Sequence, residues 1–358
     1  MKKKIIHFIY DLGRGGAETM MVRVIRELDE YENIVVTVVP MNHFGSELKC
    51  DKLICFNLKS LFSLPLIIFK FRKLVKAEKP DLIHSHLFWP NNIARLAVPQ
   101  KIPLISTIHA FIASSIEYKH WYIRLIDKLA YKVRKSIVIV VAKGALKEYF
   151  EFLKLKPYKA YVLYTFVDTA RFNINNAKPK QPSEIFRMIS VGALRTQKNY
   201  SCLIDAFTLI KDQPIELHIY GNGNLKKELQ EQIDRTGAKV ILKGEMKNIE
   251  EIIPSYDLYI MSSSFEGFSL SVLEAMAMRM PLLLSDIPSF REQCEGIAEY
   301  FQLNDTNELK NKILALSMKS ADELRAMGEK GRQKAFNNFT LEQHLQGLRS
   351  IYADALLK

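Results

Sequence analysis

The chain has 358 residues, of which 48% are hydrophobic and 25% charged, as in a soluble globular protein. This length exceeds what one ordinary hydrophobic core accommodates, so we expect two domains. No apolar run approaches the roughly 20 residues of a membrane-spanning helix. The four cysteines show none of the paired spacings of zinc sites, so we expect free thiols in a cytoplasmic protein.

The net charge of +12 is concentrated in the first half of the chain. Residues 1–180 hold 30 Lys and Arg against 15 Asp and Glu, whereas residues 181–358 carry a net charge of −3. Two basic, aromatic stretches, Leu61–Lys79 and Lys119–Lys135, suit the headgroup region of a membrane. Packing helices with solvated basic faces are an equal alternative. A peripheral contact with the inner face of the cell membrane is therefore a hypothesis, and without a recognisable binding motif we expect no nucleic acid.

Apolar runs of strand length alternate with helical patterns along the first half. A glycine turn, Gly13–Gly16, joins the first run to a helical pattern, as in a phosphate or sugar cradle. The alternation indicates βαβ units and a parallel sheet. The predicted strands are Lys4–Tyr10, Val35–Val39, Leu53–Phe56, Asp81–His86, Leu104–Ile108, Ile137–Val141 and Tyr161–Tyr164.

The same alternation starts again after the polar stretch 173–182, which is the best linker in the sequence. We therefore predict two doubly wound α/β domains, 1–172 and 183–340, and a last helix over 341–358. Such domains bind ligands at the carboxyl ends of their strands, which makes the cleft between them the expected site. The second set of predicted strands is Met188–Val191, Ile215–Tyr220, Val240–Leu242, Leu258–Met261, Leu282–Ser285 and Glu299–Phe301.

Cations and glycines follow two predicted strands of the second domain. Arg195 and Lys198 are three residues apart, so both can reach one diphosphate, although two solvated cations on a loop are the simpler alternative. Gly221, Asn222 and Gly223 allow backbone to approach a ligand, or form only a turn. No D-x-D follows a strand, so we expect no metal clamp.

Histidines lie at predicted strand ends in the first domain. His109 directly follows a strand, where it can donate a hydrogen bond or, when protonated, balance phosphate charge. A satisfied core or surface histidine is the alternative. His84 and His86 form an H-x-H pair, of which we expect one to point away from any common site. With no third ligand nearby in the sequence, we predict no metal site.

The stretch Ser262–Pro281 is predicted to be a loop that runs into a helix, which begins near Ser269 and is stopped by Pro281. Glu266 precedes the helix and Glu274 lies inside it, at a separation of roughly 12 Å from the helical rise. The N–H groups at the helix start suit a diphosphate, and the carboxylates can accept hydrogen bonds from sugar hydroxyls. Two glutamates without a function are the alternative.

Together and in this order, the motifs resemble those of the retaining nucleotide-sugar glycosyltransferases of family 4, the "glycosyl transferases group 1" type, with the GT-B architecture. The resemblance covers nearly the whole chain, and its last motif is the most specific. The motifs are GRGGAE (13–18), DLIHSH (81–86), STIHA (106–110), VLYTFVDTARF (162–172), VGALRTQKN (191–199), YGNG (220–223) and EGFSLSVLEAMA (266–277).

The resemblance implies a role for each matching residue. It implies that Glu266, His109, Arg195 and Lys198 are catalytic, with Arg195 and Lys198 on the donor diphosphate and His109 close to the reacting bond. It also implies that Gly15 and Gly16 let the first domain close on the phosphates. The donor sugar would be held by Glu266 together with Gly267, Phe268 and Ser269, and phosphate would be touched by Leu270. Glu274 would bind the ribose, and Lys243 to Met246 would lie along the base.

The sequence departs from the family pattern at three places. Ser269 replaces the last glycine of EGFG, Arg279 replaces a glycine before Pro281, and Thr165–Asp168 replaces N-G-V-D. None of these changes removes a charged donor-binding group.

The resemblance implies a metal-independent, retaining hexosyl- or N-acetylhexosaminyltransferase without a cofactor. Its donor would be a UDP-sugar, with a GDP-sugar second, and its acceptor a hydroxyl of a saccharide or lipid-linked saccharide in surface polysaccharide or lipopolysaccharide biosynthesis. Two alternatives stay open: an enzyme like UDP-N-acetylglucosamine 2-epimerase, and a non-catalytic protein that binds nucleotide sugar or membrane.

Overall fold

The computed structural model describes residues 2–13, 15–58, 64–112, 117–176 and 183–357. The chain forms two compact units, Met1–Thr165 with Glu342–Lys358, and Phe166–Leu341. Residues 177–182 of the predicted linker lie outside the described residues, and the domain limits at 172 and 183 stay predictions.

The first unit is built on a seven-stranded parallel sheet with the order β3-β2-β1-β4-β5-β6-β7. Because β1 lies between β2 and β4, the direction in which the sheet is built reverses beside β1, and the strand ends at such a point are where doubly wound sheets bind ligands. The strands are β1 Lys4–Ile9, β2 Glu32–Thr37, β3 Lys52–Cys55, β4 Leu82–His86, β5 Leu104–Ile108, β6 Ile137–Val140 and β7 Lys159–Val162.

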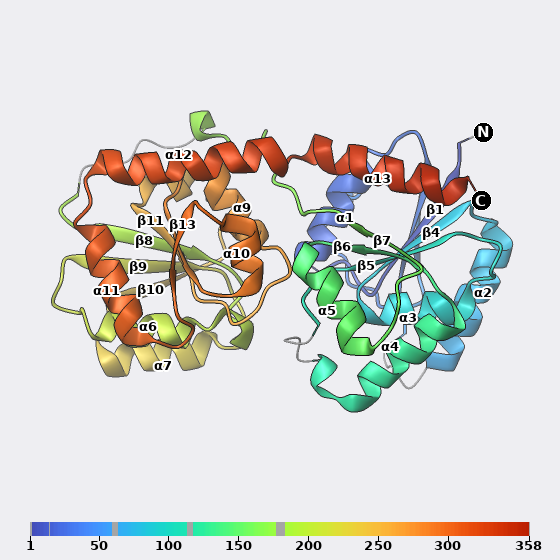
Figure 1. Cartoon of the computed structure of the whole chain (residues 1–358), viewed down its shortest axis with the longest axis horizontal. Helices are drawn as coiled ribbons and strands as arrows, with labels where there is room; N and C mark the ends of the chain where they lie inside the picture. The colour runs from blue at the N-terminus through green and yellow to red at the C-terminus, as the bar shows by residue number, and fades with distance from the viewer. Residues whose placement is uncertain (1, 14, 59–63, 113–116, 177–182, 358) are drawn as a thin grey trace. The chain divides into compact units, whose positions relative to one another are not determined.

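Helices cover both faces of this sheet (Figure 1), with α1 and α13 on one side and α2, α3 and α4 on the other. Apolar strand residues pack against the helices; the ring of Phe8, for example, stacks on that of Phe71 with 4.2 Å between the centroids. The helices are α1 Gly16–Arg26, α2 Leu64–Glu78, α3 Phe88–Ala97, α4 Trp121–Val133, α5 Lys143–Leu153 and α13 Leu341–Leu356, with short 3-10 turns η1 Gly45–Glu47 and η3 Glu117–Lys119.

The last helix, α13, is part of the first unit. The hydroxyl of Tyr352 is 2.7 Å from His84 Nδ1, and Arg349 forms an ion pair of 2.6 Å with Glu30. His344 Nδ1 is 2.8 Å from the backbone oxygen of Tyr164. These contacts attach the last helix to residues that are far from it in the sequence.

The second unit repeats the design with a six-stranded parallel sheet in the order β10-β9-β8-β11-β12-β13. The direction reverses between β8 and β11. In Figure 1, α6 and α7 lie on one side of this sheet and α9 and α12 on the other. The strands are β8 Phe186–Val191, β9 Ile215–Tyr220, β10 Val240–Gly244, β11 Leu258–Met261, β12 Leu282–Ser285 and β13 Ala298–Phe301.

The remaining elements of the second unit connect and cover these strands. Its helices are α6 Tyr200–Thr208, α7 Lys226–Thr236, α8 Ile249–Ile252, α9 Leu270–Ala277, α10 Pro288–Cys294, α11 Thr306–Ser317 and α12 Ala321–Asn338, and its 3-10 turns are η4 Ile174–Asn176, η5 Thr196–Lys198 and η6 Ile253–Ser255. The predicted fold class, two doubly wound parallel sheets, is confirmed, and each predicted strand is present with shifts only at its ends.

Candidate active site

An ion pair lies at the carboxyl ends of β8 and β11, where the second sheet reverses direction. Lys198 Nζ is 2.6 Å from Glu266 Oε1, and both side chains are largely buried. Ser263 Oγ donates to the same carboxylate oxygen at 2.8 Å, and Gln197 Nε2 donates to the other at 3.3 Å. The structure thus brings together two residues that are predicted to be catalytic and fixes the carboxylate with two further donors.

The loop after β8 is shaped to hold Lys198. A Cβ atom on Gly192 would lie 3.0 Å from Lys198 Cε and 2.8 Å from the Tyr200 hydroxyl, so only glycine leaves room for both groups. Ser262 Oγ donates to the backbone oxygens of Lys198 and Asn199 at 2.9 and 3.0 Å. By contrast, Arg195 is exposed, and its backbone donates to the Ala193 oxygen at 2.8 Å and accepts from Lys198 N at 2.9 Å.

The predicted glycine turn after β9 packs on the loop after β8. A Cβ on Gly221 would lie 2.0 Å from the Gly192 oxygen, and one on Gly223 would lie 2.4 Å from the Leu194 oxygen. Leu194 N donates to the Asn222 oxygen at 3.0 Å. These glycines therefore have a structural reason to lack side chains, which is close backbone packing between two loops.

Helix α9 begins at Leu270, and a side chain from α10 fixes its start. The N–H of Ser269 donates to Gln293 Oε1 at 3.0 Å, and Gln293 Nε2 donates back to the Ser269 oxygen at 2.9 Å. Gly267, Phe268 and Ser269 are buried. Because Gln293 already binds the Ser269 N–H, an anion at this helix start would meet the N–H groups that follow it.

The end of α9 differs from the prediction and explains one departure from the family pattern. The helix stops at Ala277, four residues before Pro281, because Arg279 adopts the left-handed conformation with φ of 59°. Met280 N donates to the Ala275 oxygen and Arg279 N to the Met276 oxygen, which are the bonds of a Schellman motif. Glycine is favoured at this position, and here Arg279 forms an ion pair of 2.6 Å with Glu329.

Glu274 of α9 lies in a setting that disfavours its charge. Desolvation by burial raises the pKa of this carboxyl to about 8; the nearby carboxylates of Glu250 and Asp168 add to the effect, and Arg171 opposes it. Arg171 itself forms an ion pair of 2.8 Å with Glu250. A protonated Glu274 can both donate to and accept from a hydroxyl group.

We expect the substitution Glu274→Gln to raise stability by about 1–3 kcal/mol at pH 7, since it removes a carboxyl that ionises more readily in the unfolded chain. Because the folded pKa is raised, the contribution of Glu274 to stability is complete below pH 4.5 and is lost as the pH rises towards 8. The gain should therefore be absent at pH 4 and largest above pH 8. Urea unfolding at several pH values measures it, with the exposed Glu231→Gln on α7 as control; a gain independent of pH would contradict the prediction.

For the remaining predicted donor residues, the described contacts do not indicate a specific role. Lys243, at the end of β10, and Met246 are both exposed. Gly15 is the N-cap of α1 and Gly16 its first residue. A Cβ on Gly15 would lie 2.2 Å from Glu18 Oε2, so a carboxylate of the chain itself lies over this helix start.

Several side chains that shape the site were not predicted. Gln197, Ser263 and Gln293 fix Glu266 and the start of α9, and Arg171 and Glu250 set the surroundings of Glu274. Gln197 and Ser263 lie next to predicted site residues in the sequence, which is a usable signal. Gln293 and Glu250 have no such signal in the sequence.

The structure corrects the interpretation of the H-x-H pair in the first unit. Residues two apart on a strand point to the same face, so the rings of His84 and His86 lie side by side on β4 with 4.1 Å between centroids. The neighbouring strand β1 adds a third ring, His7, in register with His84. The expectation that one histidine points away and that no third ligand lies nearby is wrong, because strand pairing brings His7 beside them.

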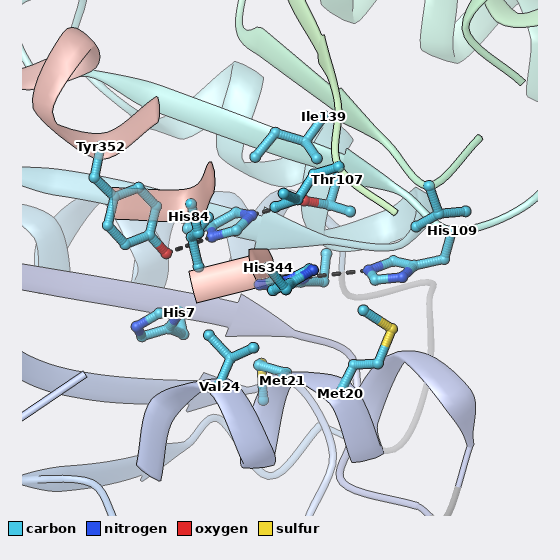
Figure 2. Close-up of a pocket in the computed structure, with 14 residues that line it drawn as sticks. His7, Met20, Met21, Val24, His84, Thr107, His109, Ile139, His344 and Tyr352 are labelled. Carbon is cyan, nitrogen blue, oxygen red and sulfur yellow. Dashed lines mark hydrogen bonds between the residues drawn. The ribbon is translucent and has the colours of Figure 1, made fainter. Parts of the chain in front are cut away.

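His109 lies at the edge of the same cluster (Figure 2). Its Nε2 atom is 3.3 Å from His86 Nδ1. Burial, with a smaller contribution from nearby His344, lowers the pKa of His109 to about 4. Of the two predicted roles, hydrogen bonding by a neutral imidazole is therefore favoured over balancing of phosphate charge at neutral pH.

Two family models match the chain in adjacent segments. "Glycosyltransferase Family 4" matches residues 14–171, and "Glycosyl transferases group 1" matches residues 172–334. The chain belongs to glycosyltransferase family 4. The predicted family is thereby confirmed, and this glycosyltransferase carries its Lys198–Glu266 pair in the segment matched by the second model.

Relatives of known activity extend over most of this glycosyltransferase. A Campylobacter jejuni N-acetylgalactosamine-N,N'-diacetylbacillosaminyl-diphospho-undecaprenol 4-alpha-N-acetylgalactosaminyltransferase is 27% identical over 94% of this chain and 96% of its own length. An Escherichia coli UDP-Gal:alpha-D-GlcNAc-diphosphoundecaprenol alpha-1,3-galactosyltransferase is 26% identical over 84% and 80%.

Solved structures show the same fold. Anabaena Alr3699/HepE in complex with UDP and glucose matches with a TM-score of 0.82 and 18% identity over 98% of this chain and 99% of its own. A Thermosynechococcus elongatus sucrose-phosphate synthase matches with a TM-score of 0.83 at 15% identity, covering 98% and 99%. The glycosyltransferase thus has the GT-B fold that was predicted. Among its described residues, no helix is long and apolar enough to span a membrane.

Proposed function

We propose that this glycosyltransferase moves a hexose or N-acetylhexosamine from a nucleotide-sugar donor to a hydroxyl of a saccharide or lipid-linked saccharide, with retention of the anomeric configuration. The observation that supports the proposal most is the Lys198–Glu266 pair beside the start of α9. Lysine and helix N–H groups suit a diphosphate, and a fixed carboxylate suits sugar hydroxyls.

The proposed mechanism draws its positive charge from the chain. Lys198, with the exposed Arg195, stabilises the departing nucleoside diphosphate, so no metal ion is needed at the diphosphate. Glu266 holds the sugar, Glu274 binds the ribose, and His109 offers a neutral imidazole to the sugar. The acceptor hydroxyl attacks on the face from which the phosphate leaves, and the departing phosphate takes its proton.

The names of the relatives support a lipid-linked acceptor in surface polysaccharide synthesis, because two of them act on diphosphoundecaprenol-linked sugars. A third relative is a putative teichuronic acid biosynthesis glycosyltransferase of Bacillus subtilis, 26% identical over 58% of this chain and 54% of its own. UDP is the preferred base in the proposal, with GDP second, and the proposed place of action is the cytoplasmic face of the membrane.

Donor identity is tested first by thermal shift with UDP, GDP and their sugars. The stabilising donor is then incubated with diphospholipid-linked acceptors, and the anomeric configuration of the product is read by NMR. We expect an α-linked product from an α-linked donor. An inverted product contradicts retention, an epimer formed from donor alone identifies the epimerase alternative, and binding without any product favours the non-catalytic one.

Helix α4 supports a peripheral membrane contact. Trp121, Leu125, Leu129 and Val133 are spaced four residues apart and are 71%, 43%, 50% and 63% exposed, so they form an outward apolar stripe. Lysines flank it at 119, 128, 132 and 135. Apolar side chains bordered by cations suit an anionic lipid interface.

The other basic stretch contributes less. In α2, Ile67 and Phe71 face the core, and only Leu66 and Phe69 stay exposed among its described large apolar side chains. Residues 61–63 of that stretch lie outside the described part of the chain.

We expect the protein to sediment with anionic liposomes at low salt and to be released at high salt, because exposed charges are screened. The double change Leu125→Ser and Leu129→Ser should weaken this binding at least about tenfold, since two apolar side chains of about 1.5–3 kcal/mol each no longer enter the lipid. Met318→Ser, at a still more exposed apolar position of the second unit, is the control. Binding that does not respond to salt or to the α4 changes would contradict a role for this helix.

A further inference from the structure

A group of imidazoles encloses a small cavity inside the first unit. His7, His84 and His86 each offer one ligand atom, and these atoms lie within 4.8 Å of one another. The cavity has a volume of about 30 Å³, which is room for one water molecule or one ion. His109 and His344 also line it, as Figure 2 shows.

Hydrogen bonding fixes the state of His7. Asn33 Nδ2 donates to the Leu28 oxygen at 2.7 Å, so Asn33 Oδ1 is the acceptor for the imidazole. His7 Nε2 therefore carries the proton and donates to Asn33 Oδ1 at 3.1 Å. The other ring atom, Nδ1, has a bare lone pair. It is buried, in a residue that is 1% exposed, and it has no hydrogen-bond partner among the residues that the structure describes.

His86 presents a second nitrogen of the same kind. Its Nε2 atom is buried and has no hydrogen-bond partner in the described part of the chain, and the residue is 6% exposed. When His86 Nδ1–H donates to His109 Nε2, at 3.3 Å, His86 Nε2 is left with a bare lone pair. Two buried acceptors without donors are costly, and an electron-pair acceptor placed in the cavity would relieve both.

His84 supplies the third nitrogen by exchanging one hydrogen bond. Its Nδ1 is 2.7 Å from the Tyr352 hydroxyl and its Nε2 is 2.7 Å from Thr107 Oγ1. Ligation through one nitrogen releases one of these hydroxyls and keeps the other, which then orients the ring. Ligating histidines are usually held in this way by a hydrogen bond from their second nitrogen.

We propose that His7, His84 and His86 form a binding site for a nitrogen-preferring transition-metal ion such as Zn²⁺, with a water molecule in the cavity as a further ligand. Among the described residues, no carboxylate lines the cavity, so Mg²⁺ and Ca²⁺, which require oxygen ligands, do not fit. The site lies wholly in the first unit and its three ligands are not residues proposed for sugar transfer, although His109, which is, lines the same cavity.

The test uses the full chain, stripped of metal with a chelator. Zn²⁺ affinity is measured by competition with a chromophoric chelator, and Co²⁺ is added as a spectroscopic probe of geometry. We expect one Zn²⁺ per chain with a dissociation constant below about 1 µM, a rise in the unfolding temperature with Zn²⁺ but not with Mg²⁺, and an X-ray absorption spectrum with imidazole ligands.

Histidine variants test which residues bind the metal ion. His7→Gln and His86→Gln should each weaken Zn²⁺ binding by more than about 10–100-fold, which is the loss caused even by changes beyond the direct ligands. The exposed His43→Gln should bind Zn²⁺ as the unchanged protein does. Wild-type binding weaker than about 10 µM, sulfur or carboxylate ligands in the absorption spectrum, or affinity that survives both cluster changes would overturn the proposal. The X-ray absorption spectrum of the unchanged protein identifies the type of ligand even if a variant fails to fold.

Discussion

Replacing Lys198 with alanine is expected to lower turnover by at least about 10²-fold, and Glu266→Ala by a similar factor. Each change removes a charge that is already held in place where the donor diphosphate and sugar are proposed to lie, which typically costs 10²–10³ in kcat. Because the two side chains are 2.6 Å apart, they should act as a unit. The double variant should therefore lose little more than either single one.

The measurement is steady-state transfer with the donor found by thermal shift. Lys227→Ala, an exposed cation on α7, is the matched control and should retain full activity. Because Lys198→Ala leaves Glu266 without its counter-ion, the unfolding temperature must be followed too; Lys198→Arg keeps the charge and separates lost folding from lost chemistry. Near-normal turnover in either alanine variant would refute the assignment of this pair.

The second large effect is expected in the core of the first unit, where Arg95 and Asp127 are both buried and 2.5 Å apart. The hydroxyls of Tyr118 and Tyr149 also donate to Asp127. Asp127→Ala should lower the free energy of unfolding by about 3–5 kcal/mol, because it leaves the Arg95 charge buried and unpaired. Since α4 carries Asp127, the loss should loosen this helix from α3.

Urea unfolding followed by tryptophan fluorescence measures this loss, because Trp89 and Trp121, the two tryptophans of the chain, both lie in the first unit. Glu151→Ala, which breaks an exposed pair with Lys147, should cost well under about 1 kcal/mol. The double change Arg95→Met and Asp127→Leu should cost less than Asp127→Ala, because no lone charge is left inside. A loss below about 1 kcal/mol for Asp127→Ala would contradict the argument.

The positions of the strands and the fold class could be predicted because parallel strands covered on both faces are nearly continuous apolar runs. Leu258–Met261 and Leu282–Ser285 are bounded by polar or glycine-containing turns, and both matched the observed strands. Helix ends were predicted less well. The left-handed conformation of Arg279 stops α9 before Pro281 does, and the only signal for it was the glycine that the family pattern has at this position.

The site could be predicted only where its residues lie near one another in the sequence or match a motif. Lys198 and Glu266 were identified from motifs, and the structure pairs them. The contacts of Gln293 and of the histidine cluster depend on long-range packing: His7, His86 and His344 come from three distant segments. No local pattern encodes the proximity of these segments, whereas the pairing of His84 and His86 follows from strand geometry and was interpreted wrongly.

The interlocked loops after β8, β9 and β10 have a consequence for the entropy of ligand binding. Gly192, Leu194 and Gly221 already donate their N–H groups to the neighbouring loops, to Tyr220, Asn222 and Gly244 respectively. A nucleotide that binds at this edge therefore orders little backbone, and its affinity is not reduced by the cost of about 1–2 kcal/mol for each residue that must be fixed. These amides should exchange slowly with solvent deuterium even when no donor is bound.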